Sequence, residues 1–138
     1  MILYTDSLDS IDAGRLGGGF FVGWPNPPSP ETHLRMLRGS IHVWLALDEE
    51  SEAVAGFVSA IGDGVLATYI PLLEVLPAYQ GGGIGSELMR RMLGTLAGIY
   101  MVDLLCDAEL QPYYERLGMR RATGMLTRNY AAQSGRVE

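Results

Sequence analysis

The sequence contains no lysine, so arginine supplies all ten of its positive charges. Sixteen acidic residues outnumber the arginines and leave a net charge of −6 at pH 7. The arginines adjoin one another only in the pairs Arg90-Arg91 and Arg120-Arg121. Because nucleic-acid binding normally requires a basic surface, we expect no nucleic-acid partner. An acidic chain favours cationic molecules and amines instead.

Cysteine is nearly absent as well, since Cys106 is the only one. A single thiol excludes an intrachain disulfide framework and any metal site built from several cysteines. The leucines beside it predict that Cys106 is a buried thiol on a strand. We expect no metal site, because His33 and His42 are too isolated to form a metal pair. The pattern places His33 on a helix surface and His42 at the start of a strand.

Long hydrophobic runs are also missing, and none approaches the ~20 residues that a membrane helix requires. The N-terminus, MILYTDSLDS, has neither the basic start nor the apolar stretch of a signal peptide. These absences predict a cytoplasmic protein with no membrane partner. The chain has 138 residues, 48% of them hydrophobic, which is enough for one core. We therefore expect one domain over residues 1–130 and a frayed tail over 131–138.

The hydrophobic pattern predicts a single-domain α/β fold, a mixed sheet with helices packed on it. Ser29 and Pro30 have the character of an N-cap and a first helical residue. The proline-rich stretch 23–30 is expected to be a stiff loop, and the acidic stretch 48–52 a hairpin turn. Strands are expected at 2–4, 42–47, 53–61, 67–76, 100–105 and 119–130, and helices at 10–16, 31–37, 84–96 and 110–117.

A glycine-rich loop joins the strand expected at 67–76 to the helix that follows it. Its three consecutive glycines leave backbone N–H groups uncovered by side chains, so an anion can approach them closely. The helix adds its own free N–H groups and the positive end of its dipole. This arrangement suits a phosphate or a pyrophosphate, and a tight turn without a ligand is the alternative.

Two familiar phosphate-binding motifs do not fit this loop. A P-loop requires Gly-Lys-Ser/Thr, and the chain has no lysine. A dinucleotide-binding turn follows the first strand of a parallel unit, whereas these glycines follow the fourth strand, after a predicted antiparallel hairpin.

Two segments of the sequence resemble motifs of the GNAT superfamily of N-acetyltransferases. Residues 75–85 resemble its central motif, Val-x-Pro-x-x-Arg/Gln-x-x-Gly-x-Gly/Ala, with matches at Val75, Pro77, Gln80, Gly83 and Gly85. Residues 110–119 resemble its C-terminal Ala-x-x-aromatic-Tyr-Glu-x-x-Gly-Phe segment. The resemblance implies a mostly antiparallel sheet, splayed at the cofactor strand and covered by helices on both faces.

The same resemblance implies where acetyl-CoA binds. The backbone of Leu73 and Val75 should pair with the pantetheine arm. The pyrophosphate should bind backbone N–H groups of the loop and the first helical turn, in residues Gln80, Gly81, Gly82, Gly83, Ile84, Gly85 and Ser86. Direct attack by an amine is implied, with Tyr114 as the general acid that protonates the departing thiolate.

The base is the least defined part of the predicted site. Glu74 is the best candidate, because a carboxylate within an apolar strand is costly to bury without a partner. It should point to the sheet face opposite Leu73 and Val75. Asp103 is a weaker alternative, and in many relatives a chain of water molecules takes this role.

The acceptor side of the cleft is expected beside the proline-rich loop, where Phe21 and Trp24 would line it. An aromatic wall suits an apolar or cationic acceptor, and the alternative is a hydrophobic anchor for the loop. A non-catalytic acyl-CoA-binding module, and transfer of a longer acyl group or transfer to oxygen, remain open. The family often forms dimers, so a homodimer is also an expectation.

Overall fold

The fold is a five-stranded sheet, which a computed structural model describes for residues 1–136. Its strands lie in the order β1-β2-β3-β4-β5, and only the last pair, β4 and β5, is parallel. This confirms the predicted mixed and mostly antiparallel sheet. The strands are β1 (Ile2–Thr5), β2 (His42–Asp48), β3 (Val54–Gly62), β4 (Ala67–Val75) and β5 (Met101–Asp103).

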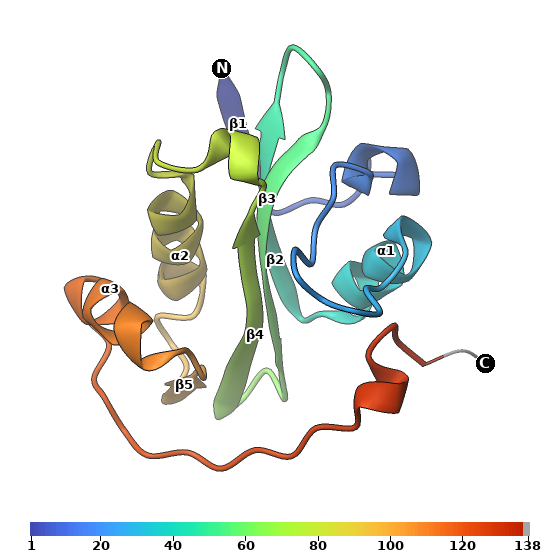
Figure 1. Ribbon diagram of the computed structural model, residues 1–138. Coiled ribbons are helices and arrows are strands. Elements are labelled where there is room, and N and C mark those ends of the chain that lie inside the picture. The colour runs from blue at the N-terminus through green and yellow to red at the C-terminus, as the bar shows by residue number, and fades with distance from the viewer. Residues whose placement is uncertain (137–138) are drawn as a thin grey trace.

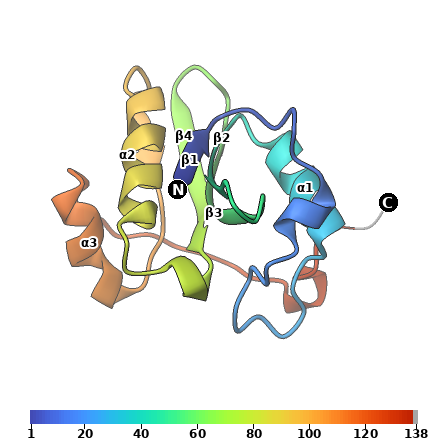
Figure 2. The same ribbon diagram turned by 90° about the horizontal axis from the view of Figure 1, so that it is seen from above.

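Helices cover both faces of the sheet, as Figures 1 and 2 show. On one face lie the short helix η1 (Ala13–Leu16) and α1 (Pro30–Gly39). On the other lie α2 (Ile84–Thr95) and α3 (Gln111–Arg116). The remaining single turns are η2 (Pro77–Tyr79), η3 (Ala108–Leu110) and η4 (Tyr130–Ala132). No helix in residues 1–136 has the length and apolar content needed to cross a bilayer.

Helix α1 begins where the sequence predicted. The Ser29 hydroxyl accepts a hydrogen bond from the Thr32 backbone N–H at 3.1 Å, and Pro30 occupies the first turn. The prediction for His33 is wrong, because its side chain is only 1% exposed and packs against the rings of Phe20 and Phe57. Its Nε2 atom has no hydrogen-bond partner among the described residues. His33 is therefore part of the core.

Helix α2, which lies within the helix expected at 84–96, packs on the sheet through an apolar stripe. Its buried residues are Ile84, Leu88, Met89 and Met92, and they contact Val58 and Ile70 of the sheet in one cluster. Because residues about four positions apart lie on one face of a helix, these side chains all face the sheet. Their burial holds the helix axis along it.

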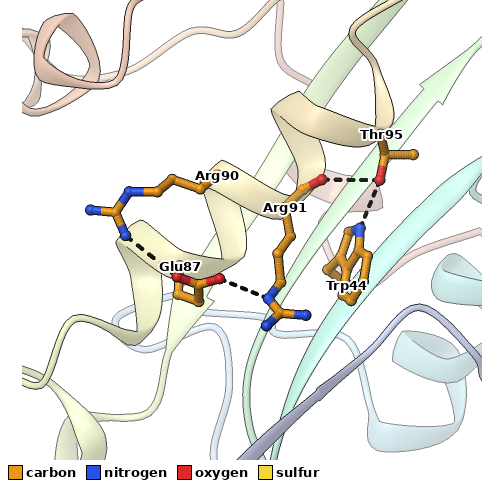
Figure 3. A network of polar contacts seen from close by, with 5 residues as sticks. All are labelled: Trp44, Glu87, Arg90, Arg91 and Thr95. Atoms are coloured by element: carbon orange, nitrogen blue, oxygen red, sulfur yellow. Dashed lines mark hydrogen bonds and ion pairs between the residues drawn. The ribbon is translucent and has the colours of Figure 1, made fainter.

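A polar network attaches the outer face of α2 to the edge of the sheet (Figure 3). Arg91 is paired with Glu87 at 2.8 Å, and its guanidinium lies 4.6 Å from the Tyr4 ring centroid and 5.1 Å from that of Trp44. The Trp44 Nε1–H donates to the Thr95 hydroxyl at 2.9 Å. Each cation–π contact is worth about 0.5–1 kcal/mol at an exposed site. The network thus keeps α2 in place above β1 and β2.

Strand β4 contains a bulge that changes which way its backbone faces. Ser59 pairs with Leu72 and Ile61 with Tyr69, so Ile70 and Pro71 together oppose one residue of β3. Proline suits this position because it has no N–H to give to the ladder.

The effect of the bulge can be followed in two hydrogen bonds. Before it, the Leu66 carbonyl accepts from Met101 N–H, so even-numbered residues face β5. Beyond it, Leu76 N–H donates to the Ala55 carbonyl, so even-numbered residues face β3. Leu73 and Val75 therefore direct their backbone groups away from β3. Strand β5 pairs only with residues 67–69, which leaves these groups beside a gap.

The predicted strand at 119–130 is absent. Residues 117–129 form no helix or strand, and the chain crosses from α3 on one side of the sheet to α1 on the other (Figures 1 and 2). The end of this segment is held in place, since Gln133 accepts from Asn26 N–H and the Arg136 carbonyl accepts from Arg35, each at 3.0 Å. Gln133 and Arg136 thus contact the rest of the fold, whereas the frayed tail over 131–138 stays a prediction, and residues 137–138 lie outside the described part.

Burial of His33 makes stability depend on pH. Loss of hydration lowers the pKa of His33 from 6.5 to about 4. Between these pH values the unfolded chain binds the proton more readily, so the free energy of unfolding should fall as pH drops from 6.5 towards 4. We expect His33→Leu to reduce this acid-dependent loss by on the order of 1–3 kcal/mol, measured by urea unfolding at several pH values. His42→Leu, which removes an exposed histidine, should keep the wild-type pH dependence.

Candidate active site

The gap beside β4 opens into a cleft of about 670 Å³. Its floor is the second half of β4, residues 70–75, and its far wall is the segment 104–107 after β5. The Val75 carbonyl, which faces the gap, accepts a hydrogen bond from the Gln80 side chain at 3.0 Å. The Val75 N–H and both backbone groups of Leu73 lack a strand neighbour on this side. An extended ligand can pair with them as an added strand would.

The glycine loop and the start of α2 lie at one end of the cleft and present free N–H groups. The backbone N–H groups of residues 81–86 donate to no acceptor among the described residues. Gly83, the N-cap, adopts the left-handed conformation with φ 84°, and no side chain caps the helix. A Cβ added at Gly81, Gly82 or Gly83 would meet nothing within 4 Å, so the backbone is open to a ligand. This is the arrangement that binds phosphate oxygens.

Gln80 differs from the rest of the predicted loop. Its backbone N–H already donates to the Pro77 carbonyl at 3.3 Å, and its side chain is bonded to Val75. The free N–H groups therefore begin at Gly81. Gln80 fixes the loop to the end of β4 and has no free backbone donor of its own.

Tyr113 and Tyr114 of α3 face different surroundings, with ring centroids 5.0 Å apart. The Tyr113 hydroxyl accepts from the Ser86 hydroxyl at 3.2 Å and lies against Gly85, so this side chain packs on α2. Tyr114 lines the cleft. Burial, with smaller contributions from Tyr113 and Cys106, raises the pKa of Tyr114 to about 12. The Tyr114 hydroxyl is thus protonated at every physiological pH.

Glu74 points to the face opposite Leu73 and Val75, as its place in the strand predicted. Its carboxylate lines the cleft and accepts the backbone N–H of Phe21 at 2.6 Å and that of Val22 at 3.4 Å. Partial burial raises the pKa of Glu74, and the two hydrogen bonds partly offset this increase. Phe21 has φ 66°, an uncommon conformation for a residue with a side chain. Glu74 therefore stabilises the bend of this loop.

Of the two aromatic residues expected on the acceptor side, Trp24 lines the cleft and Phe21 does not. The Phe21 ring is only 3% exposed and packs in the core against His33 and Phe57. The cause is the left-handed bend at Phe21, which directs its ring inward. Val22 takes its place at the cleft.

The sequence did not indicate several other residues that line the cleft. Cys106 is half-buried in the segment after β5, and is not the buried strand thiol that was predicted. Leu126 and Arg128 reach the cleft from the extended segment after α3. No periodicity or motif marks these two, because their position depends on how the chain crosses the sheet.

Among residues 1–136, no group of three or more histidine, cysteine or acidic side chains is placed to hold a metal ion.

Comparison with known proteins places these features in a family. Residues 39–120 match the family model of the acetyltransferase (GNAT) domain. The chain is 32% identical over 117 residues to serotonin N-acetyltransferase 2, chloroplastic, of Oryza sativa subsp. japonica, covering 81% of this chain and 58% of that protein. It is 27% identical over 118 residues to GCN5-related N-acetyltransferase 1, chloroplastic, of Arabidopsis thaliana, covering 84% and 56%. The chain thus spans less than two thirds of these relatives' length.

Solved structures agree with the family match. A Deinococcus radiodurans R1 protein, provisionally assigned as an acetyltransferase, is 47% identical with a TM-score of 0.94, and 99% of this chain and 94% of that chain are covered. A GNAT family acetyltransferase of Streptococcus pneumoniae TIGR4 is 31% identical with a TM-score of 0.75, covering 94% and 98%.

The left-handed turn at Gly83 yields a test of the loop. We expect Gly83→Ala to destabilise the fold by about 1–2 kcal/mol, because a Cβ is disfavoured at positive φ. It should also weaken binding of coenzyme A, because the turn sets the direction of the free N–H groups.

Gly94→Ala is the matched control, since Gly94 lies in the same helix without positive φ or near neighbours. That variant should bind coenzyme A normally and gain stability. Thermal unfolding and calorimetric titration measure the two effects; equal binding by both variants would contradict the role of the turn.

Proposed function

The chain belongs to the GNAT family of acetyltransferases, and from this membership we propose that it transfers an acetyl group from acetyl-CoA to a primary amine of a small molecule or protein. The observation that carries the proposal is that two sets of backbone groups without hydrogen-bond partners lie along one cleft. The Leu73 and Val75 backbone at the gap suits the amide groups of a pantetheine arm. The free N–H groups of residues 81–86 suit a pyrophosphate.

Binding in this position directs the thioester towards Tyr114. In direct attack, the neutral amine adds to the thioester carbonyl carbon, the C–S bond breaks, and the sulfur leaves with the electron pair. The nitrogen then loses a proton and the sulfur gains one, so the reaction is balanced. The Val75 N–H is the group we propose to polarise the carbonyl, because it faces the gap without a strand partner.

Tyr114 is proposed as the general acid. Its pKa of about 12 keeps the hydroxyl protonated before reaction, as an acid requires. Because an ordinary thiol has a pKa near 8.5, complete transfer from this phenol is uphill. We therefore expect Tyr114 to stabilise the departing thiolate as a hydrogen-bond donor. Tyr114 passes its proton to the sulfur only as it receives the proton that the amine has lost. The phenol is therefore not left ionised.

Glu74 is proposed as the group that accepts the proton of the amine or holds the amine in place. Its partial burial raises its pKa, which makes the carboxylate a stronger base than an exposed one. Its position in the cleft supports this role over Asp103, which lies on β5 and borders a different groove. A water molecule bound to Glu74 can relay the proton while Oε1 keeps its bonds to the loop.

The acceptor is proposed to lie between Trp24 and Tyr114. The rice relative is named as a serotonin N-acetyltransferase, and an aromatic amine would stack on an indole such as Trp24. Arg128 is the one cationic residue that lines this cleft among those described, whereas Glu74 and Asp107 are acidic. The excess of negative charge favours a cationic amine in the encounter.

The alternative is a non-catalytic module that binds acyl-CoA. One observation favours it: Oε1 of the Glu74 carboxylate is already bonded to the loop, so only Oε2 is left to accept a proton at the cleft floor. Release of free thiol from acetyl-CoA, measured with serotonin, an aliphatic diamine and a peptide with a free N-terminus, separates the two functions. Turnover of any amine supports the enzyme. Coenzyme A binding with no turnover of any of them supports the module.

Removal of the Tyr114 hydroxyl tests the acid. We expect Tyr114→Phe to lower kcat by roughly 10²–10⁴-fold with little change in affinity for coenzyme A. Tyr113→Phe is the matched control and should retain activity, because its hydroxyl contacts Ser86 and not the cleft. Unchanged turnover in Tyr114→Phe would rule out the proposed role.

Replacement of Glu74 by glutamine separates its two tasks. The glutamine oxygen can still accept from Phe21 N–H, but the charge and the base are lost. We expect kcat/KM to fall by about 10²–10⁴-fold, and the decline of wild-type activity as pH drops through the Glu74 pKa to disappear. Asp103→Asn should keep both activity and pH profile. A Glu74→Gln enzyme with wild-type kcat/KM would show that Glu74 acts only on the loop.

A further inference from the structure

One cationic side chain in the cleft has no charged partner. Arg128 lines the cleft near the end of the extended segment after α3, and the residue is exposed. Within residues 1–136 its guanidinium forms no ion pair, and its one hydrogen bond goes from Nη1 to the carbonyl of its neighbour Thr127 at 3.1 Å. A guanidinium carries five N–H donors in a planar fork that matches the two oxygens of a carboxylate. Most donors of Arg128 are therefore open to a ligand.

Arg128 lies at the same mouth of the cleft as Trp24 and Glu74. The extended segment crosses the sheet to the α1 side, where η4 follows it (Figures 1 and 2). Just beyond, Gln133 accepts from Asn26 N–H, in the loop that also carries Trp24. The Glu74 carboxylate points to this side too, because it accepts two N–H groups of the N-terminal loop. The three side chains thus border the cleft on the α1 face of the sheet.

The phosphates of acetyl-CoA are proposed to bind elsewhere. The free N–H groups of residues 81–86 belong to the glycine loop and the start of α2, which covers the other face of the sheet (Figure 1). An anionic group bound by Arg128 on the α1 side therefore belongs to the acceptor and not to the cofactor.

Charge indicates which acceptor suits this mouth. Glu74 and Asp107 are acidic, and Arg128 is the only cationic residue lining the cleft among those described. An amine in its ammonium form is attracted by the carboxylates but repelled by an unpaired guanidinium. A molecule with both an amino group and a carboxylate satisfies charges of both signs. Trp24 and Leu126, 37% and 63% exposed, offer apolar surface for a side chain.

We propose that the acceptor is an amino acid with an apolar or aromatic side chain, whose carboxylate binds the Arg128 guanidinium and whose amino group lies beside Glu74. This inference rests on the proposed acetyl transfer and narrows its acceptor. Arg128 then determines specificity. It selects amino acids over amines without a carboxylate, and over peptide N-termini, where a peptide bond replaces the carboxylate.

Tryptophan and tryptamine, which differ only in the carboxylate, test the role of Arg128. We expect Arg128→Gln to lower kcat/KM for tryptophan by about 10–100-fold, mainly through KM, because hydrogen bonds to a charged group are lost. No such fall is expected for tryptamine. Each variant is compared with the wild type on the same amine, so the different reactivities of the two amino groups cancel. Arg128→Glu should lower kcat/KM for tryptophan further and raise it for tryptamine, because the new charge attracts an ammonium group.

Arg120→Gln is the matched control. Arg120 lies in the same exposed segment and forms no ion pair within residues 1–136, but it borders a different groove. This variant should keep the wild-type values for both amines. Affinity for coenzyme A, measured by calorimetric titration, should be the same in Arg128→Gln and in the wild type.

Several results would overturn the inference. An equal loss for both amines in Arg128→Gln would assign Arg128 a structural role, and weaker coenzyme A binding would assign it to the phosphates. A wild type that acetylates tryptamine but not tryptophan would contradict the inference and leave the proposed acetyl transfer intact.

A wild type that acetylates no amine would contradict the proposed transfer instead, and binding then decides the question. Titrated into the protein saturated with coenzyme A, tryptophan should bind more tightly than tryptamine, and Arg128→Gln should remove the difference. Equal binding of the two molecules by the wild type would overturn the role of Arg128.

Discussion

The bulge at Ile70 and Pro71 is the constraint on which the rest of the site depends. It reverses which backbone groups of β4 face β3, so that Leu73 and Val75 face outwards where β5 has already diverged. Without it, the backbone of Leu72 and Glu74 would face the gap, and the Glu74 side chain would move to the α2 side. One extra residue therefore determines both the unpaired backbone edge at the gap and the sheet face on which the carboxylate lies.

Glu74 then connects the two sides of the cleft. On one side it belongs to the strand that we propose to hold acetyl-CoA, and on the other it bonds the N–H of Phe21, whose bend places Val22 and Trp24. A half-buried carboxylate is stabilised by such donors, so its bonds to the loop also lower the free-energy cost of keeping it ionised beside the position proposed for the amine. Structural and chemical roles for Glu74 are compatible, because one carboxylate has about four acceptor positions.

The parts of this protein that local chemistry determines could be predicted from the sequence. The Ser29 cap, the α2 stripe, the glycine turn and the direction of Glu74 each depend on residues a few positions apart.

The predictions that failed involve contacts between residues far apart in the sequence. The place of His33 on an apolar face of α1 does not reveal that aromatic rings from β3 and the N-terminal loop bury it. Phe21 turns inward because of a hydrogen bond to a residue 53 positions away. The segment 119–130 was predicted as a strand, but within the described residues it pairs with no strand of the sheet, although β5 has a free edge.

The two sides of the cleft also differ in how they are built. The side that we propose to hold acetyl-CoA consists of backbone groups from a strand and a helix start that the core holds in place, so few side-chain substitutions can alter it. The side that we propose for the acceptor consists of exposed loops and the extended segment after α3, tied together by single bonds such as that from Asn26 N–H to Gln133. Leu126 and Arg128, which belong to the extended segment after α3, form part of this wall. Substitutions there cost little stability, so under the proposed function this side is the part of the molecule where specificity for the acceptor can change most freely.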